Sequence, residues 1–470
     1  MAIKDVPRFE THAHSEYSNI RLLDCINRPK DLLTTAAKLG YSGLTITDHE
    51  CLSSHVQFLT LEKELKEKGK LPEDFKLGLG NEIYLTDTRD KSQKYFHFIL
   101  IAKDTIGHRA LRELSSTAWY NSYFDRGMER VPVLKDELSH LVMKYPGHLI
   151  ASTACLGGEL ATLTNELIKA EKKKDEEEII RLKTDIVGFL NYCVTLFGKD
   201  FYIEIAPAKS KDQIQFNARV KDIAAALNIP MIFATDAHYL TANDRSVHKA
   251  YLNSKDGERE IDDFYYYSHL MDNEEAFDNL YPYFNEEEFC QMCANTIEIM
   301  DKIGTYEIFH NPIIPEVKVK PYSVINTNGL DNYPVISKLL KGNDQEKYWT
   351  CQCLSALKKK NLNNETYLQR LETEAKVIDT IGQKLGNCLF AYFNTFQHYI
   401  DLFWECGSLS GPGRGSSVCF LSNYLLGITQ LDPVEWELDY WRFLNEERVE
   451  LPKQNIGQVK IGEHFSMVCA

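Results

Sequence analysis

The feature that most constrains this chain is a series of short apolar runs, most of which carry or lead into a potential metal ligand. The runs have the length and composition of buried strands, and segments with helical spacing (29–39, 179–196 and 213–227) lie between them. Strands that alternate with helices indicate a parallel α/β arrangement. The runs cover residues 43–47, 76–80, 95–102, 148–152, 201–205 and 231–235.

Histidines, carboxylates and one cysteine recur at these runs. His12-Ala-His14 places two imidazoles on the same face of a strand, and Asp236-Ala-His238 repeats that pattern. In parallel α/β folds the carboxyl ends of strands collect functional side chains, so we expect these groups to meet. The further candidates are Asp48, His49, Glu82, His97 and Cys155.

The residue types in this set indicate bound metal. Taken singly, His97 could be a satisfied core histidine and Cys155 a small buried apolar residue. Imidazoles with carboxylates suit Zn²⁺, Mn²⁺ or Fe²⁺, and the single thiolate favours Zn²⁺. So many ligands imply two or three ions, which would bind a phosphoryl oxygen and activate water. The sequence therefore predicts phosphoester hydrolysis.

Composition excludes several classes of protein. The chain has 470 residues, with 53 Lys and Arg against 68 Asp and Glu, so a basic nucleic-acid coat protein is excluded. Its 23 Phe, 25 Tyr and 5 Trp supply enough apolar surface to exclude a wholly disordered chain. There is neither a secretory signal at the start nor an apolar run near the ~20 residues that span a bilayer. We expect a cytoplasmic protein with no membrane partner.

Three further segments have local interpretations. Cys290 and Cys293 have a metal-like spacing, but no second pair accompanies them, and we interpret them as structural residues of a helix. The charge run within 167–180 predicts a solvated helix face. Four prolines and a cluster of turn residues between 311 and 334 indicate a linker or an extended crossing between domains.

A glycine-rich loop, Gly411-Pro-Gly-Arg-Gly-Ser-Ser417, precedes a predicted helix at 418–427. Glycines allow close backbone approach to a ligand, and a helix amino end offers free N–H groups to phosphate. Arg414 could add a bidentate contact and Ser416 a hydroxyl. The loop lacks the Gly-Lys-Ser/Thr of a P-loop and could equally be a simple turn. The candidate nucleotide-binding residues are Gly411, Gly413, Arg414, Gly415 and Ser416.

The first set of motifs resembles the PHP (polymerase and histidinol phosphatase) domain, in the form found in bacterial or phage DNA polymerase III alpha subunits. The strings are His12-Ala-His14, Ile46-Thr-Asp-His49, Asn81-Glu82, Tyr95-Phe-His97, Ala154-Cys155 and Asp236-Ala-His238. The resemblance implies a distorted seven-stranded (β/α)7 barrel with two or three Zn²⁺ or Mn²⁺ ions and a 3′–5′ exonuclease that can proofread. The implied ligands are His12, His14, Asp24, His49, Glu82, His97, Cys155, Asp236 and His238, with His12, His14, Glu82, Asp236 and His238 as the catalytic group.

The resemblance also implies supporting groups, Asp48 and Glu204, beside the ligands. The glycine loop, Tyr424 to Pro433 and Arg442 to Pro452 resemble the palm of the same polymerases, where the loop holds the incoming nucleotide's phosphates. The expected domains are 1–285 for PHP, 286–345 for a linker and the start of the palm region, 346–452 for a partial α+β palm, and 453–470 for an unrelated tail.

The sequence departs from the family after Pro452. Lys453 stands where the first catalytic acid of the palm is expected, so polymerisation, with its Mg²⁺, is not expected from this chain alone. We hypothesise a coding region interrupted at this point. The expected partners are DNA with a primer 3′ end, deoxynucleoside triphosphates, and the remaining polymerase portion or other replisome proteins. A stand-alone PHP phosphoesterase and a non-catalytic polymerase fragment stay open as alternatives.

Overall fold

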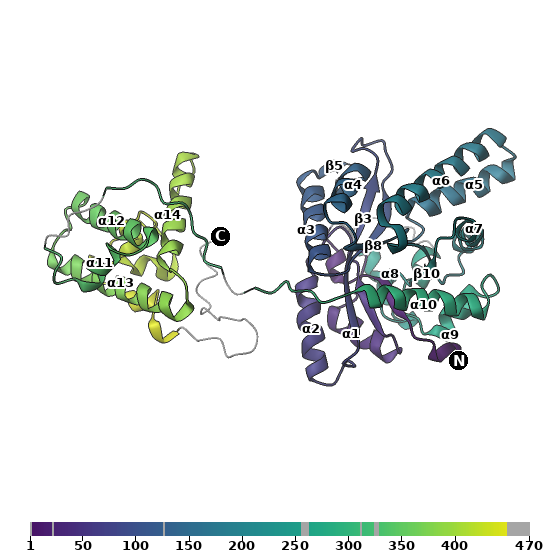
Figure 1. Cartoon of the computed structure of the whole chain (residues 1–470), viewed down its shortest axis with the longest axis horizontal. Helices are drawn as coiled ribbons and strands as arrows, with labels where there is room; N and C mark the ends of the chain where they lie inside the picture. The colour runs from purple at the N-terminus through teal and green to yellow at the C-terminus, as the bar shows by residue number, and fades with distance from the viewer. Residues whose placement is uncertain are drawn as a thin grey trace. The chain divides into compact units, whose positions relative to one another are not determined.

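The computed structural model describes residues 2–20, 23–125, 127–254, 263–310, 313–323 and 329–448. The chain divides into two compact units, Met1–Ile308 and Phe309–Ala470 (Figure 1). Each unit is described by itself. The predicted tail at 453–470 lies outside the described residues, as do parts of the predicted proline-rich linker.

The first unit is built on a nearly closed barrel of seven strands in the order β1-β2-β3-β4-β8-β9-β10. A parallel bridge between Ala13 and Ala237 brings the two ends of this order together, and the His14 N–H donates to the Ala237 carbonyl at 3.1 Å. The strands are β1 (Phe9–Ala13), β2 (Gly43–Ile46), β3 (Lys76–Thr86), β4 (Phe96–Ala102), β8 (Leu149–Ser152), β9 (Phe201–Ile205) and β10 (Met231–Phe233).

The barrel is distorted because β4 runs antiparallel to both of its neighbours, β3 and β8, whereas the other pairs in the order are parallel. Each of the six predicted apolar runs contains a strand, and the predicted PHP-type distorted barrel is confirmed. Three short strands were not predicted: β5 (Tyr123–Asp125) and β6 (Met128–Arg130) form a hairpin, and β7 (Pro132–Leu134) pairs with β3.

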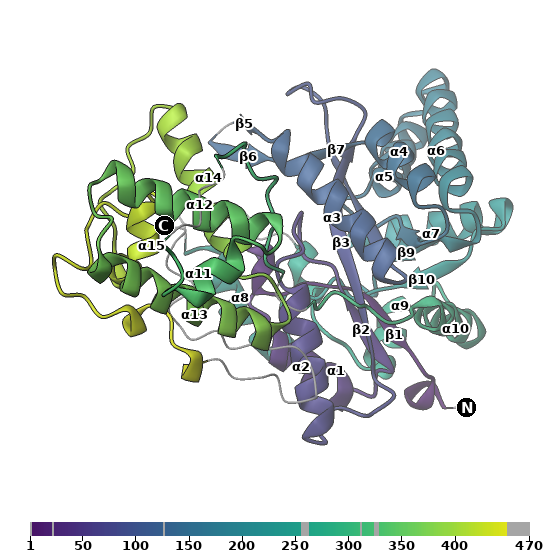
Figure 2. The ribbon, with the colours of Figure 1, turned by 60° about the vertical axis from the view of Figure 1, so that its left-hand side comes forward.

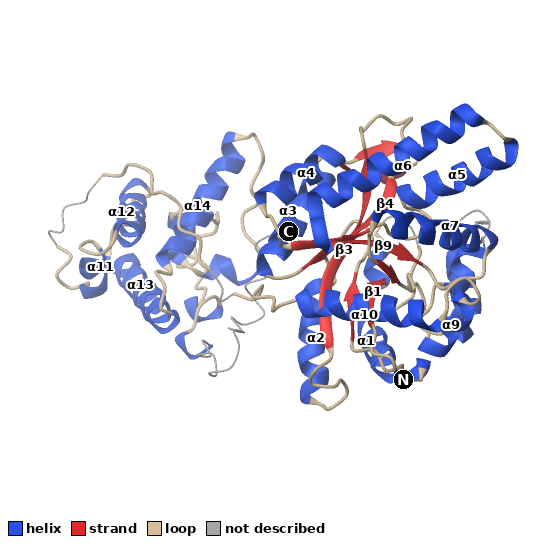
Figure 3. Cartoon of the chain, turned by 45° about the vertical axis from the view of Figure 1, so that its right-hand side comes forward, coloured by secondary structure: helices blue, strands red, loops and turns tan. Residues whose placement is uncertain are grey.

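Helices surround the strands of this unit (Figure 3). Their apolar faces pack on the barrel, as in α1, where Leu32, Leu33 and Ala36 are buried at helical spacing. The helices are α1 (Pro29–Lys38), α2 (His55–Glu67), α3 (Thr105–Tyr120), α4 (Lys135–Lys144), α5 (Glu159–Lys173), α6 (Glu176–Phe197), α7 (Lys211–Leu227), α8 (Arg245–Leu252), α9 (Asn273–Leu280) and α10 (Glu286–Lys302).

The charge run predicted as one helix face instead spans the end of α5 and the start of α6. Lys174 takes a left-handed conformation (φ +57°) and ends α5, and the Asp175 side chain accepts from Glu178 N–H to begin α6. The reason is electrostatic, because lysines occupy the last turn of α5 and glutamates the first turn of α6, where each sign complements the helix dipole.

Helix α10 belongs to the first unit, so the compact division falls at 308/309, whereas the sequence placed it at 285/286. The Asn285 side chain caps α10, and the buried Phe289 and Met292 pack into the barrel core. The turn at Asn285 therefore begins a helix that packs on the first unit, and the domain boundaries remain a prediction. Cys293 is fully buried in the same core, in agreement with a structural role.

Helices are the regular elements among the described residues of the second unit (Figure 2), and none of the strands of an α+β palm occurs there. Its core includes Trp349 and Phe393, both almost fully buried. The helices are α11 (Pro334–Leu339), α12 (Asp344–Lys359), α13 (Glu365–Leu385), α14 (Phe390–Glu405) and α15 (Leu421–Leu425). No helix in the described part of the chain is both long and apolar enough to cross a membrane.

Candidate metal centre and nucleotide loop

The barrel brings all nine predicted ligands into one cluster. They reach it from six strands or the residues that directly follow them, except for Asp24, which comes from the loop before α1. Eight of the nine residues are buried, and His97 is partly exposed. The sequence predicted which residue types would meet, whereas their roles as ligands are not tested by the fold.

Four side chains form the inner part of the cluster. His12 Nε2 lies 2.8 Å from Glu82 Oε2, 3.2 Å from Asp236 Oδ1 and 3.0 Å from His14 Nε2. His14 Nε2 lies 3.1 Å from each of the same two carboxylate oxygens. Facing ring nitrogens and carboxylate oxygens at this spacing are an arrangement that could hold a metal ion.

A second group adjoins the first. His14, His49 and His238 offer ring nitrogens close enough to share an ion, and His238 Nε2 lies 3.4 Å from His49 Nε2. Asp24 Oδ2 lies 3.2 Å from His49 Nε2 and 3.7 Å from His238 Nε2. Asp24 therefore faces the histidines as the resemblance implied.

A third group lies at the edge of the cluster. His97 Nδ1 contacts Glu82 Oε1, and the Cys155 sulfur lies 3.5 Å from the same ring nitrogen. Glu82 thus faces both the inner group and His97. Gly157 allows this arrangement, because a Cβ at that position would lie 2.9 Å from Cγ of the His97 ring.

Three histidines have their Nδ1 atoms held by acceptors, an arrangement that favours the tautomer a metal requires. His12 Nδ1–H donates to Glu204 Oε1 at 2.7 Å, and His238 Nδ1–H donates to the backbone carbonyl of Asp236 at 2.8 Å. His14 Nδ1 lies 3.1 Å from Ser18 Oγ, whose own proton goes to Asp48 at 2.8 Å. With Nδ1 engaged in this way, the Nε2 atoms point into the cluster, where a metal would take them as ligands.

Several buried polar atoms in the cluster form no hydrogen bond of good geometry. They are Asp24 Oδ1, Glu82 Oε1, Asp236 Oδ1 and His49 Nδ1. Buried polar atoms are almost always satisfied, so atoms that converge here without such bonds fit bound cations. Asp236 also has a strained left-handed backbone (φ +47°), which is typical of functional positions. The residues therefore fit the metal that a PHP domain uses.

Electrostatics agree with this fit. Burial opposes the ionisation of Glu82 and Asp24, but nearby imidazoles outweigh it. His97 and His49 hold the pKa of Glu82 well below its usual value, and His238 and His49 do the same for the pKa of Asp24. The cluster thus keeps its carboxylates ionised, as ligands of a cation must be.

The remaining ligands show how burial and charge compete. Burial lowers the pKa of His12, yet Asp236 and Glu204 raise that pKa well above its usual value. For His14, burial and repulsion from neighbouring histidines lower the pKa. Burial raises the pKa of the Cys155 thiol well above its usual value. A bound cation would offset that cost, because it stabilises the thiolate.

The supporting residues were only partly predicted. Glu204 contacts His12 as expected and also accepts from Ser152 Oγ at 2.6 Å. Asp48 acts through serines, since it accepts from Ser15 Oγ as well as from Ser18 Oγ. Sequence reasoning missed these serines, because serine is common and its role depends on a contact across the fold.

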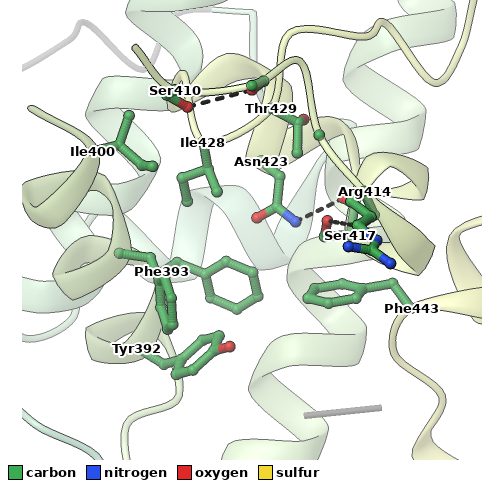
Figure 4. Close-up of a pocket in the computed structure, with 13 residues that line it drawn as sticks. Tyr392, Phe393, Ile400, Ser410, Arg414, Ser417, Asn423, Ile428, Thr429 and Phe443 are labelled. Atoms are coloured by element: carbon green, nitrogen blue, oxygen red, sulfur yellow. Dashed lines mark hydrogen bonds between the residues drawn. The ribbon is translucent and has the colours of Figure 1, made fainter. Parts of the chain in front are cut away.

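The glycine loop of the second unit lines a cavity of about 440 Å³ (Figure 4). Gly411, Gly413 and Arg414 are among the lining residues, whereas Gly415 and Ser416 are not. Gly413 has φ +124°, and a Cβ there would lie 2.5 Å from a Val418 methyl group. The opposite wall, which sequence reasoning missed, is aromatic and consists of Tyr392, Phe393, Phe396 and Phe443.

The helix expected directly after the loop begins later. A 3-10 turn covers Gly415–Cys419, and α15 begins at Leu421. Its first amides are not free, since Leu421 N–H and Ser422 N–H donate to the buried Glu374 carboxylate at 2.7 and 2.9 Å. The predicted phosphate contact through this helix end is therefore wrong, because a carboxylate fills that place. The five loop residues remain a prediction.

Comparisons with known proteins follow the division into two units. The PHP domain model matches residues 10–208, and the model of the bacterial DNA polymerase III alpha NTPase domain matches residues 336–457. The chain contains a PHP domain followed by a bacterial DNA polymerase III alpha NTPase domain. The second match includes the glycine loop and extends five residues past Pro452, into the predicted tail.

Relatives align with nearly the whole chain. It is 39% identical over 468 residues to the probable DNA polymerase YorL of Bacillus subtilis (strain 168) and to the DNA-directed DNA polymerase of Bacillus phage SPbeta, with 95% of this chain and 36% of each relative covered. It is 28% identical over 461 residues to DNA polymerase III subunit alpha of Borreliella burgdorferi, with 95% and 34% covered. The chain spans about a third of the length of these relatives.

Proposed function

We propose that this chain is the amino-terminal portion of a replicative DNA polymerase of the III alpha type, and that its PHP cluster is a metal-dependent 3′–5′ exonuclease that proofreads. The observation that carries the proposal is the set of three histidines whose Nδ1 atoms each contact an acceptor, so that their Nε2 atoms converge on buried carboxylates. A structural cluster would not need ring nitrogens and carboxylates gathered in this way.

Two or three Zn²⁺ or Mn²⁺ ions would be held by the nine ligands and would supply charge stabilisation and an activated water to the phosphodiester. Glu204 keeps the His12 proton on Nδ1, and Ser18 with Asp48 does the same for His14. The near-complete burial of the ligands excludes bulk water, which strengthens each electrostatic contact with the phosphate.

For the second unit, we propose that residues 346–452 form part of a polymerase palm and that the cavity behind the glycine loop accepts a deoxynucleoside triphosphate. Arg414 lines the cavity, and none of the described acids lies within ion-pair distance of it, so its guanidinium is available for phosphate. Polymerisation would require Mg²⁺ and palm acids from a remaining polymerase portion. A replicative role of this kind would place the protein in the cytoplasm with DNA and other replisome proteins.

The exonuclease proposal is tested with two substrates in parallel assays. One is a primer–template with a mismatched 3′ end, and the other is a chromogenic phosphate monoester. Digestion that His12→Ala and Asp236→Asn abolish supports the proposal. His140→Ala, an exposed histidine on α4, is the matched control and should retain full activity. Turnover of the monoester alone would indicate a stand-alone phosphoesterase. A folded, metal-loaded chain with neither activity would be a non-catalytic fragment.

The triphosphate proposal has its own test. Arg414→Gln should weaken the binding of a fluorescent deoxynucleoside triphosphate about tenfold, since a charge-assisted contact of this kind contributes about 1.5 kcal/mol or more. Arg109→Gln, an exposed arginine on α3, changes the same charge elsewhere and should have no effect. Equal binding by both variants would contradict the proposal.

A further inference from the structure

The metal cluster opens at one ligand. The His97 side chain is 26% exposed, whereas the side chains of His12, His49 and Asp236 are no more than 8% exposed. Gly157 packs directly against the His97 ring and also lines a neighbouring pocket. The pocket therefore lies beside the exposed edge of the cluster.

The pocket has a volume of about 380 Å³, within the usual range for a ligand site. Three of its lining side chains are cationic and one is a carboxylate, although the chain as a whole carries a formal charge of −15. The charged residues are Lys91, Lys94, Arg130 and Asp125, and the aromatic ones are Tyr95, Phe96 and Tyr123.

Aromatic rings connect the pocket to the cluster. The Tyr84 ring lies 4.7 Å from the His97 ring and stacks on Tyr95 at 5.3 Å. The Arg130 guanidinium lies 5.5 Å from the Tyr95 ring centre and also donates to the Tyr95 hydroxyl. Two stacked rings and then a cation thus lead outward from the most exposed ligand.

The β5–β6 hairpin forms the outer side of the pocket, and Figure 1 shows β5 beyond the end of α3. Tyr123 and Arg130 pair across this hairpin, so both side chains are fixed by one short sheet. Lys91 Nζ donates to the Phe124 carbonyl at 3.2 Å and lies 5.8 Å from the Tyr123 ring centre. Phe124 itself is 69% exposed, which leaves a further aromatic ring at the rim.

We infer that this pocket binds single-stranded DNA immediately before its 3′ end and so delivers the terminal phosphodiester to the cluster. A cationic groove that follows the backbone, with rings on which bases stack, is the general means of gripping single strands. A frayed 3′ end suits this arrangement, because the cluster is buried and His97 is its most exposed ligand. The inference rests on the proposed exonuclease function and names its substrate class.

Binding without turnover tests the pocket directly. In the full chain, with EDTA present, Lys91→Gln combined with Arg130→Gln should weaken anisotropy-measured binding of a fluorescent oligodeoxynucleotide about tenfold. The slope of log Kd against log salt should fall by about 0.7 for each phosphate that the variant no longer neutralises. Arg181→Gln combined with Lys183→Gln on the exposed face of α6 is the matched control and should change neither. Unchanged binding by the pocket variant overturns the inference.

A second pair of variants separates stacking from folding. Tyr123→Leu should weaken binding about tenfold, whereas Tyr123→Phe, which keeps the ring, should bind normally. Equal losses from both would overturn a stacking role. The metal content of each variant, measured by mass spectrometry, should match the wild type, because none of these residues is a ligand.

Hydrolysis distinguishes the two proposals. The Lys91/Arg130 double variant should raise KM for the oligonucleotide and leave turnover of bis(p-nitrophenyl) phosphate unchanged, since that small diester needs no upstream grip. If Asp236→Asn leaves both hydrolyses intact, the proposed exonuclease fails whatever the pocket does. If Asp236→Asn abolishes both and the double variant matches its control, only the pocket inference fails.

Discussion

Replacement of Glu204 by glutamine tests the claim that outer contacts prepare the ligands. Glu204 is 2% exposed, accepts the His12 Nδ1 proton at 2.7 Å, and accepts from Ser152 at 2.6 Å. Its backbone N–H donates to Thr153 Oγ1 at 3.0 Å, which keeps the residue in place when the side chain changes. Glutamine preserves the size of the side chain but removes the charge that favours the Nδ1–H tautomer.

The expected loss follows from the strength of that contact. A hydrogen bond to a charged group contributes about 1.5–3 kcal/mol and a neutral one about 0.5–1.5 kcal/mol, so the change removes about 1–2 kcal/mol. This corresponds to a roughly 5- to 30-fold loss of metal affinity, which overlaps the roughly 10- to 100-fold range typical of such partners.

Competition with a chromogenic Zn²⁺ chelator measures this affinity. Glu177→Gln on α6 is the matched control, because Glu177 is exposed and its replacement removes the same charge. Circular dichroism establishes that both variants fold. A Glu204→Gln protein that folds normally and binds Zn²⁺ as tightly as the control would refute the reasoning.

Three further predictions concern stability and the cluster edge. Burial, with repulsion from His108, lowers the pKa of His55 to about 3. As the pH falls, the unfolded state therefore binds this proton at a higher pH than the folded state does. The free energy of unfolding, measured with urea, should be greatest above about pH 6.5 and about 2 kcal/mol lower at about pH 5. His55→Gln should remove this pH dependence, and an unchanged pH dependence would contradict the assignment. Gly157→Ala would push the His97 ring aside and should lower metal content, whereas Gly188→Ala, which has open space, should not. Glu374→Gln should destabilise the second unit by about 3 kcal/mol in thermal unfolding. The reason is that the Arg370 guanidinium and the amides at the start of α15 would no longer face a charged acceptor. Glu365 is exposed, so an equally small effect from Glu365→Gln and Glu374→Gln would refute this prediction.

Much of the barrel was predictable because its signals are local. A short apolar run predicts a buried strand without information from the rest of the chain. The spacing of His12 and His14 likewise places both side chains on one face of a strand. Residue type likewise limits the chemistry, since imidazoles, carboxylates and a thiolate favour transition metals over Mg²⁺. The sequence was less informative where one local pattern has two outcomes, as at the turn around Asn285, which begins a helix of the first unit.

By itself, the sequence determined most strands of the barrel, the identity of the nine ligand-capable residues and the glycine loop. Only the tertiary structure decided the orientation of the His12 ring, because Glu204 lies 192 residues away in the sequence and contacts it across the barrel. Closure between Ala13 and Ala237 likewise placed His14 beside His238. Glu374 occupied the helix end that the loop pattern had left open for phosphate. Hydrophobic periodicity and residue type can be read from residues close together in the sequence. A hydrogen bond between residues far apart in the sequence forms only in the folded protein, and no local sequence pattern predicts it.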